Sequence, residues 1–167
     1  MSIQSKIIDQ VGIISLDRPE KANAYDRAHL DALAAHFDRL STECRIVIIQ
    51  SSDPRFFCAG ADLNELKVAS PSDAQNLRSQ AVFTAIARSK CISIATIEGA
   101  AIAGGCELAL AADLRVIGAN AVFRLPETAL GIIPAAGGCT RLPALLGASV
   151  AKSVILGGAE ITAEQAT

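Results

Sequence analysis

Residues 98–107, EGAAIAGGCE, combine the residue types best suited to chemistry in this chain. Gly104 and Gly105 open an apolar run, CELALAADL, that predicts a buried helix. Residues without a Cβ at a helix start leave the first backbone N–H groups open to an approaching oxygen. Glu107 follows Gly104 by about one helical turn, so its carboxylate is expected on the same face as that amide. The segment predicts an anion site beside a proton-transfer group.

A structural interpretation fits the same segment equally well. In it the glycines allow close packing at a tight strand-to-helix turn, and Glu107 is a favourable anion in the first helical turn. A second run of small residues, Ala59, Gly60 and Ala61, precedes Asp62 in residues 56–63, FFCAGADL. This run could expose another backbone amide, although an ordinary strand-to-helix loop explains it more simply when it is taken alone.

Glu127 is a candidate second acid. Its neighbours are apolar, which predicts partial desolvation and therefore favours the protonated carboxyl; they are Leu125, Pro126, Ala129 and Leu130. The alternative is a surface glutamate in the first helical turn after Pro126. A candidate acid would accompany the candidate base at Glu107.

Other common catalytic groups are poorly placed for chemistry. The two histidines, His29 and His36, share one predicted amphipathic helix, where a structural or surface role is the simpler explanation. The cysteines, at positions 44, 58, 91, 106 and 139, are odd in number. They form no CxxC pair and have no histidine nearby at the spacing of metal ligands. They are interpreted as reduced, small core residues of a cytoplasmic protein, without a metal site. Carboxylates are thus the natural proton-transfer groups.

The composition indicates one globular domain and excludes several functions. The chain has 167 residues, of which 51% are hydrophobic and 19% charged, and its net charge is -2. No basic run interleaves with aromatic residues, so nucleic acid is a poor candidate partner. Charged residues interrupt the most apolar region before a run of about 18 residues is reached, which predicts no membrane span. The N-terminus, MSIQSKIIDQ, resembles neither a signal nor a transit peptide.

Hydrophobic patterning predicts alternating strands and helices. A strand, a helix and a strand in this order indicate an α/β protein with parallel strands. The predicted strands are a hairpin over residues 3–16 and single strands over 45–50, 92–97, 114–117 and 122–125. The predicted helices cover residues 26–42, 70–89 and 148–156, together with the run at 106–114 that the glycine pair opens, and one more begins in 161–167.

Four segments in this order resemble the crotonase superfamily, also called the enoyl-CoA hydratase/isomerase family. They are RPEKANA at 18–24, FCAGAD at 57–62, GGCE at 104–107 and PETALGIIP at 126–134. The resemblance covers essentially the whole chain. It implies an α/β crotonase (ClpP/crotonase-like) fold of repeated ββα units in a spiral. Residues 1–167 would be one core domain, with the family's C-terminal helical part largely absent.

The resemblance also implies an active site. The backbone N–H groups of Ala61 and Gly104 would form an oxyanion hole around the thioester carbonyl of a coenzyme A ester. Hydratases of the family retain both acids, so Glu107, favoured as an anion by the helix N-terminus, would activate water for attack at C3, and Glu127 would protonate C2. Residues implied to contact substrate are Lys21, Ala22, Ala24, Ala59, Ala61, Asp62, Leu63, Gly105, Pro126 and Gly131.

The implied activity is hydration of a trans-2-enoyl-CoA. No metal or separate cofactor is expected, because coenzyme A is part of the substrate. A Δ3,Δ2-enoyl-CoA isomerase, another CoA-ester lyase or a non-catalytic acyl-CoA-binding module are the alternatives, and a homo-oligomer, either a trimer or a dimer of trimers, is expected. The chain departs from the family at Tyr25, where leucine or methionine is frequent, and at Asp17, Ala135 and Cys139-Thr140.

Overall fold

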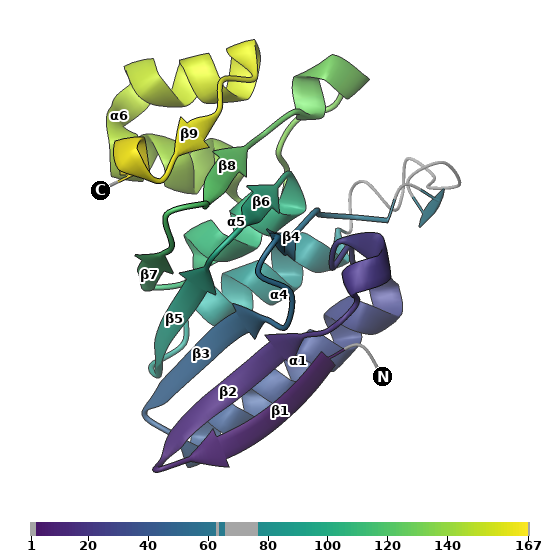
Figure 1. The fold of residues 1–167 in the computed structure, drawn as a ribbon, viewed down its shortest axis with the longest axis vertical. Helices are drawn as coiled ribbons and strands as arrows, with labels where there is room; N and C mark the ends of the chain where they lie inside the picture. Colours follow the sequence, from purple (N-terminus) through teal and green to yellow (C-terminus); the bar gives the residue numbers. More distant parts are fainter. Residues whose placement is uncertain (1–2, 63, 66–76, 167) are drawn as a thin grey trace.

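A computed structural model describes residues 3–62, 64–65 and 77–166. Its larger sheet has five strands in the order β1-β2-β3-β5-β7 (Figure 1). These are β1 (Ile3–Ile8), β2 (Val11–Leu16), β3 (Ile46–Ser51), β5 (Ile92–Ile97) and β7 (Leu114–Ile117). β1 and β2 form the predicted antiparallel hairpin, and the other neighbouring strands are parallel.

A smaller sheet has the order β4-β6-β8-β9. It contains β4 (Phe56–Cys58), β6 (Ala100–Ile102), β8 (Val122–Arg124) and β9 (Ile161–Thr162). Three pairs of consecutive strands alternate between the two sheets, and a helix follows each pair along the chain. In each pair the first strand belongs to the larger sheet and the second to the smaller one; the pairs are β3 and β4, β5 and β6, and β7 and β8. This is the predicted repeat of ββα units, and it brings β4 and β6 together although their residues are far apart in sequence.

Helices pack against the larger sheet and against one another. α1 (Arg27–Glu43) begins after Asp26, whose carboxylate accepts a hydrogen bond from the His29 N–H at 3.0 Å. It buries Leu30, Leu33, Phe37 and Leu40. α4 (Arg78–Ala87) packs between α1 and the wholly buried α5 (Gly104–Ala111). α4 lies within the helix predicted over 70–89, and the start of that predicted helix, at residues 70–73, lies outside the described residues.

The C-terminal region differs from the sequence prediction. α6 (Gly138–Gly157) begins ten residues before the helix predicted at 148–156, and Gly147 breaks it with φ 77°. Residues 138–157 are long and apolar enough to cross a membrane by length and composition alone, contrary to the prediction. The break at Gly147 leaves two pieces that are each shorter than the roughly 20 residues of a span.

The prediction of a final helix at 161–167 is wrong for the described residues. Ile161 and Thr162 form β9, which pairs antiparallel with β8, and a 3-10 turn, η3 (Glu164–Ala166), follows. The Thr162 N–H donates to the Gln165 side-chain oxygen at 3.0 Å. β-branched residues suit a sheet edge, and the pairing with β8 outweighs the local helical preference.

Candidate active site

Asn23 holds the loop between β2 and α1 against β4. Asn23 is 5% exposed. Its side-chain oxygen accepts a hydrogen bond from the Arg18 N–H at 2.7 Å, and its side-chain NH2 donates to the Phe57 backbone carbonyl at 3.1 Å. Ala22 and Asn23 both have left-handed backbone conformations, with φ 49° and 56°. The Ala22 carbonyl in turn accepts from the Ala59 N–H at 3.0 Å. Two segments predicted to bind substrate therefore lie side by side.

Charged groups join the same two segments. The Arg18 guanidinium lies 3.3 Å from the Asp62 carboxylate and donates to the Ala24 carbonyl at 2.9 Å. The Lys21 ammonium lies 3.9 Å from the same Asp62 carboxylate, and its side chain is 47% exposed. Lys21 is thus available at the surface for an anionic group. Leu63, also predicted to contact substrate, lies outside the described residues.

Ala61 and Gly104, the two predicted oxyanion donors, lie in adjoining loops. The Tyr25 N–H donates to the Gly60 carbonyl at 2.8 Å, and the Asp62 N–H donates to the Tyr25 carbonyl at 2.7 Å. These bonds flank Ala61, whose own N–H has no hydrogen-bond partner within the described part of the chain. A Cβ built on Gly60 would lie 2.9 Å from the Gly104 nitrogen, so the two loops are in contact.

The glycine pair at the start of α5 serves two different purposes. Gly104 is the first residue of the helix, so its N–H has no acceptor one turn earlier within the helix. A Cβ on Gly105 would lie 1.9 Å from the Cys58 carbonyl oxygen. Gly105 is therefore required for α5 to pack on β4, which is the structural role considered for it from the sequence.

Glu107 is buried, with 4% of its surface exposed. Its Oε1 accepts hydrogen bonds from the N–H groups of Ala136 and Gly138, at 2.7 and 2.8 Å. Burial raises the pKa of Glu107 to about 7, and the Glu127 charge adds to the rise, although the two N–H groups oppose it. The expectation that the helix N-terminus favours the Glu107 anion is wrong, because desolvation outweighs the helix dipole here.

Glu127 is the first residue of a 3-10 helix, η2 (Glu127–Leu130), and is 7% exposed. Burial raises its pKa, as its apolar neighbours predicted, and the alternative of a surface glutamate is wrong. Its Oε2 is buried without a hydrogen-bond partner in the described part of the molecule. A buried carboxyl oxygen without a partner is costly unless water or a ligand supplies one.

The two carboxyls belong to one cluster. The charges of both Glu107 and Glu127 raise the pKa of Tyr25, Cys106 and Cys139, so both act on the same three groups. Cys139 is exposed, unlike the four buried cysteines, so its interpretation as a core residue is wrong. Across the described ranges, no group of three or more His, Cys, Asp or Glu residues could hold a metal ion.

Pro126 and Gly131 bound η2 at its two ends. Pro126 precedes Glu127 as the N-cap, and Gly131 follows as the C-cap with φ 73°. Gly131 is exposed, and a Cβ built on it would meet no atom within 4 Å. Both residues shape the turn that carries Glu127.

Sequence reasoning missed Arg141, in the first turn of α6, as a residue of this cluster. Its guanidinium donates to the Ala136 carbonyl at 2.9 Å, and its charge lowers the pKa of Glu107. Gly138 was also missed as a support of Glu107. A Cβ there would lie 3.1 Å from the Glu107 Oε1 and 2.8 Å from the Pro134 Cβ. Only the Gly137-Gly138 pair could have signalled this close approach.

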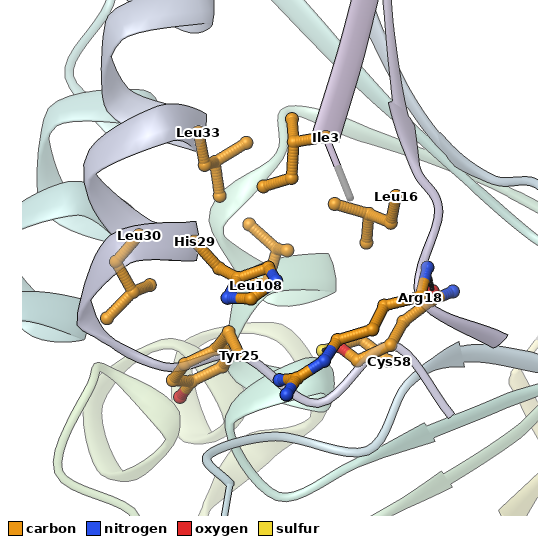
Figure 2. A pocket seen from close by; sticks show the side chains of 10 residues that line it. Ile3, Leu16, Arg18, Tyr25, His29, Leu30, Leu33, Cys58 and Leu108 are labelled. Carbon is orange, nitrogen blue, oxygen red and sulfur yellow. Dashed lines mark hydrogen bonds between the residues drawn. The ribbon is translucent and has the colours of Figure 1, made fainter. Parts of the chain in front are cut away.

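A small cavity lies on another side of Tyr25, lined mainly by apolar side chains of β1, β2, α1 and α5 (Figure 2). Tyr25, Cys58 and Leu108 border it, whereas neither Glu107 nor Glu127 does. Its volume of about 20 Å³ suits a single water molecule. The cavity is therefore separate from the acid pair and too small for an acyl chain.

The described residues thus include two backbone amides in adjoining loops and a pair of buried carboxyls, and such groups suit a substrate that develops charge on a carbonyl oxygen. The profile of the family described as enoyl-CoA hydratase/isomerase matches residues 6–167. The chain belongs to this family, and its fold is the crotonase fold.

Relatives and solved structures agree with this assignment. The chain is 45% identical over 157 residues to a probable mitochondrial enoyl-CoA hydratase 2 of Arabidopsis thaliana, covering 92% of this chain and 52% of that protein. It is 39% identical over 158 residues to the 2,3-dehydroadipyl-CoA hydratase of Escherichia coli, covering 94% and 62%. The crystal structure of an enoyl-CoA hydratase from Bacillus anthracis matches with a TM-score of 0.93 at 34% identity, covering 99% of this chain and 66% of that one. The chain thus spans about half to two thirds of the length of these relatives.

Proposed function

We propose that this chain hydrates a trans-2-enoyl-CoA, adding water across its C2–C3 double bond. The observation that carries the proposal is the pair of buried carboxyls, Glu107 and Glu127, in one cluster, with Glu107 in the same helix, α5, whose first N–H, that of Gly104, has no acceptor within the helix. Relatives at 37–45% identity are named as hydratases of enoyl-CoA, dehydroadipyl-CoA and methylglutaconyl-CoA. The family assignment supports a CoA ester as the substrate class.

Glu107 is the proposed base. Its Oε1 is held by two backbone N–H groups, which leaves Oε2 to bind and orient a water molecule. A pKa of about 7 makes the carboxylate available near neutral pH and strong enough to accept a proton. As water attacks C3, Glu107 takes its proton, and the electrons of the double bond move toward the thioester oxygen.

Glu127 is the proposed acid. Its raised pKa favours the protonated form, which delivers a proton to C2 as the enolate collapses. Meanwhile the N–H groups of Ala61 and Gly104 hold the negative thioester oxygen, with about 3 to 4 kcal/mol expected from each donor. One proton and one hydroxyl are added in total, and proton exchange then restores Glu107 and Glu127.

The adjoining loops are proposed to hold the coenzyme A part. Lys21 is exposed beside the paired segments at Ala22 and Ala59, and an ammonium there suits a phosphate oxygen. Their small side chains leave room for a narrow chain. Coenzyme A enters as part of the substrate, so the proposed reaction uses no separate cofactor.

Mixing the protein with crotonyl-CoA tests the proposal, because hydration removes the absorbance of the conjugated enoyl thioester. Glu107→Gln and Glu127→Gln are each expected to lower the rate roughly 100-fold or more. kcat/KM should rise with pH through about 7, as Glu107 ionises. A matched control is Glu43→Gln, which alters an exposed glutamate paired with Arg39 at 3.2 Å and should leave the rate unchanged.

Near-normal rates in either active-site variant would refute the roles given to the two glutamates. Conversion of a 3-enoyl-CoA to the 2-enoyl isomer without hydration would instead indicate the isomerase activity that the family name includes. Binding of crotonyl-CoA without any turnover would indicate the acyl-CoA-binding module.

A homo-oligomer is part of the proposal. α6 exposes large apolar side chains to solvent, and such a surface favours association with a second copy; they are Leu145, Leu146, Val150 and Leu156. Light scattering of the protein in solution measures the number of copies. A monomer at micromolar concentration would overturn this part.

A further inference from the structure

Tyr25 lies beside both proposed oxyanion donors. Its backbone bonds to the Gly60 carbonyl and the Asp62 N–H, on either side of Ala61. Its side chain reaches the other donor, because a Cβ built on Gly104 would lie 1.8 Å from the Tyr25 hydroxyl oxygen. One residue therefore borders Ala61 through its backbone and Gly104 through its hydroxyl.

The ring of Tyr25 is fixed by packing. It meets the Phe83 ring edge to face, with centroids 5.9 Å apart and an angle of 87° between the planes. In Figure 2 the ring borders the small cavity, and its hydroxyl points away from Leu33 and Ile3. A donor held in this way loses little conformational freedom when it binds a ligand atom.

The Tyr25 hydroxyl is a neutral donor. Burial raises its pKa well above the ordinary value, and the charges of Cys58, Glu107 and Glu127 act in the same direction, whereas a hydrogen bond with the Ser79 side chain lowers the pKa. The phenol consequently keeps its proton across the pH range in which enzymes work. A neutral O–H beside a developing oxyanion stabilises it without giving up the proton.

We propose that the Tyr25 hydroxyl donates a third hydrogen bond to the thioester oxygen, beside the amides of Ala61 and Gly104. It would then be a catalytic residue of the enolate step, and no covalent bond to it forms or breaks. This inference rests on the proposed function. Tyr25 replaces the leucine or methionine that is frequent in the family, and neither of those side chains carries a donor.

Tyr25→Phe tests the inference, because phenylalanine keeps the ring contact with Phe83 and removes only the hydroxyl. With crotonyl-CoA, kcat is expected to fall roughly 10- to 100-fold, as for the loss of a donor to a charged oxygen. KM should change less than about threefold, since the bond strengthens mainly in the transition state. Thermal unfolding of the variant checks that the fold is retained.

A second readout does not need turnover. The bound chromophore trans-4-(dimethylamino)cinnamoyl-CoA absorbs at longer wavelength when hydrogen bonds draw electron density to its thioester oxygen. The unaltered protein should shift the absorbance to longer wavelength, and Tyr25→Phe should shift it less while the probe stays bound. A smaller shift together with a lower kcat supports the third donor.

An unchanged shift and an unchanged kcat in Tyr25→Phe would overturn the inference. A change in KM alone would also overturn it, because the hydroxyl would then contact the acyl chain and not the reacting oxygen. If the unaltered protein hydrates no enoyl-CoA, the proposed function fails. The comparison of the two bound spectra would still decide whether Tyr25 donates to the thioester oxygen.

Discussion

Replacing Glu107 by glutamine should change how stability depends on pH. In the folded protein burial raises the Glu107 pKa from 4.5 to about 7, so the folded state binds the proton more tightly than the unfolded chain does. The contribution of Glu107 to stability is therefore fully present below pH 4.5 and is lost as the pH rises through 7. The loss is about 3 kcal/mol, at about 1.4 kcal/mol for each tenfold change in proton affinity.

Glu107→Gln removes this titration and keeps the size and the carbonyl oxygen of the side chain. Its Oε1 can still accept from the Ala136 and Gly138 N–H groups. For a chain of this size each kcal/mol changes Tm by roughly 2–4 °C. About 2.5 kcal/mol of the loss falls between pH 5 and pH 8, so the Tm of the variant, measured against the unaltered protein, should rise by about 5–10 °C over that range.

Scanning calorimetry at several pH values between 4 and 9 measures this difference. Comparing the two proteins at each pH removes the titrations that they share. Glu43→Gln is the control, because Glu43 is exposed at a surface ion pair and its substitution should give a nearly constant difference. A pH-independent Tm difference for Glu107→Gln would refute the conclusion that burial raises the Glu107 pKa.

Two further predictions concern the supports of the site. Gly138→Ala should lower the free energy of unfolding by about 1–3 kcal/mol. It should also reduce crotonyl-CoA turnover, because the new Cβ would lie 3.1 Å from the Glu107 Oε1; urea unfolding and the absorbance assay measure these effects. Asn23→Ala should lower the free energy of unfolding by about 3 kcal/mol, because it leaves buried partners, including the Phe57 carbonyl, without their hydrogen bond; urea unfolding measures this change.

Gly131→Ala is the control for the glycine substitution. Unlike Gly138, it has a positive φ, of 73°, and no atom lies within 4 Å of the added Cβ, so only backbone strain of about 1 kcal/mol is expected. Equal effects of the two glycine substitutions would contradict a steric role for Gly138. An Asn23→Ala protein as stable as the unaltered one would contradict the role of Asn23 in holding the loop.

Local patterns predicted much of the fold. The strand at 92–97 and the strand at 114–117 have the predicted bounds, because apolar runs of strand length between turn residues have few other stable arrangements. The last helix was mispredicted because the partner of residues 161–162 is β8, almost forty residues earlier. Local sequence carries no information on such a pairing.

The residue types at the candidate site were also evident from the sequence. The spacing of Gly104 and Glu107 predicted an amide and a carboxyl at one helix start, and the apolar neighbours of Glu127 predicted its burial. These properties depend on neighbours within one helical turn, so they can be inferred without tertiary structure.

Only the tertiary structure decided how these groups act on one another. Glu107 titrates near neutral pH because burial and the Glu127 charge raise its pKa more than the N–H groups of Ala136 and Gly138 lower it, and all three of these residues are distant in sequence. Tyr25 reaches Gly104 because the loop before α1 packs against β4 and α5. Desolvation and close approach depend on which surfaces meet in space, and that is set by the packing of the ββα units, not by neighbouring residues.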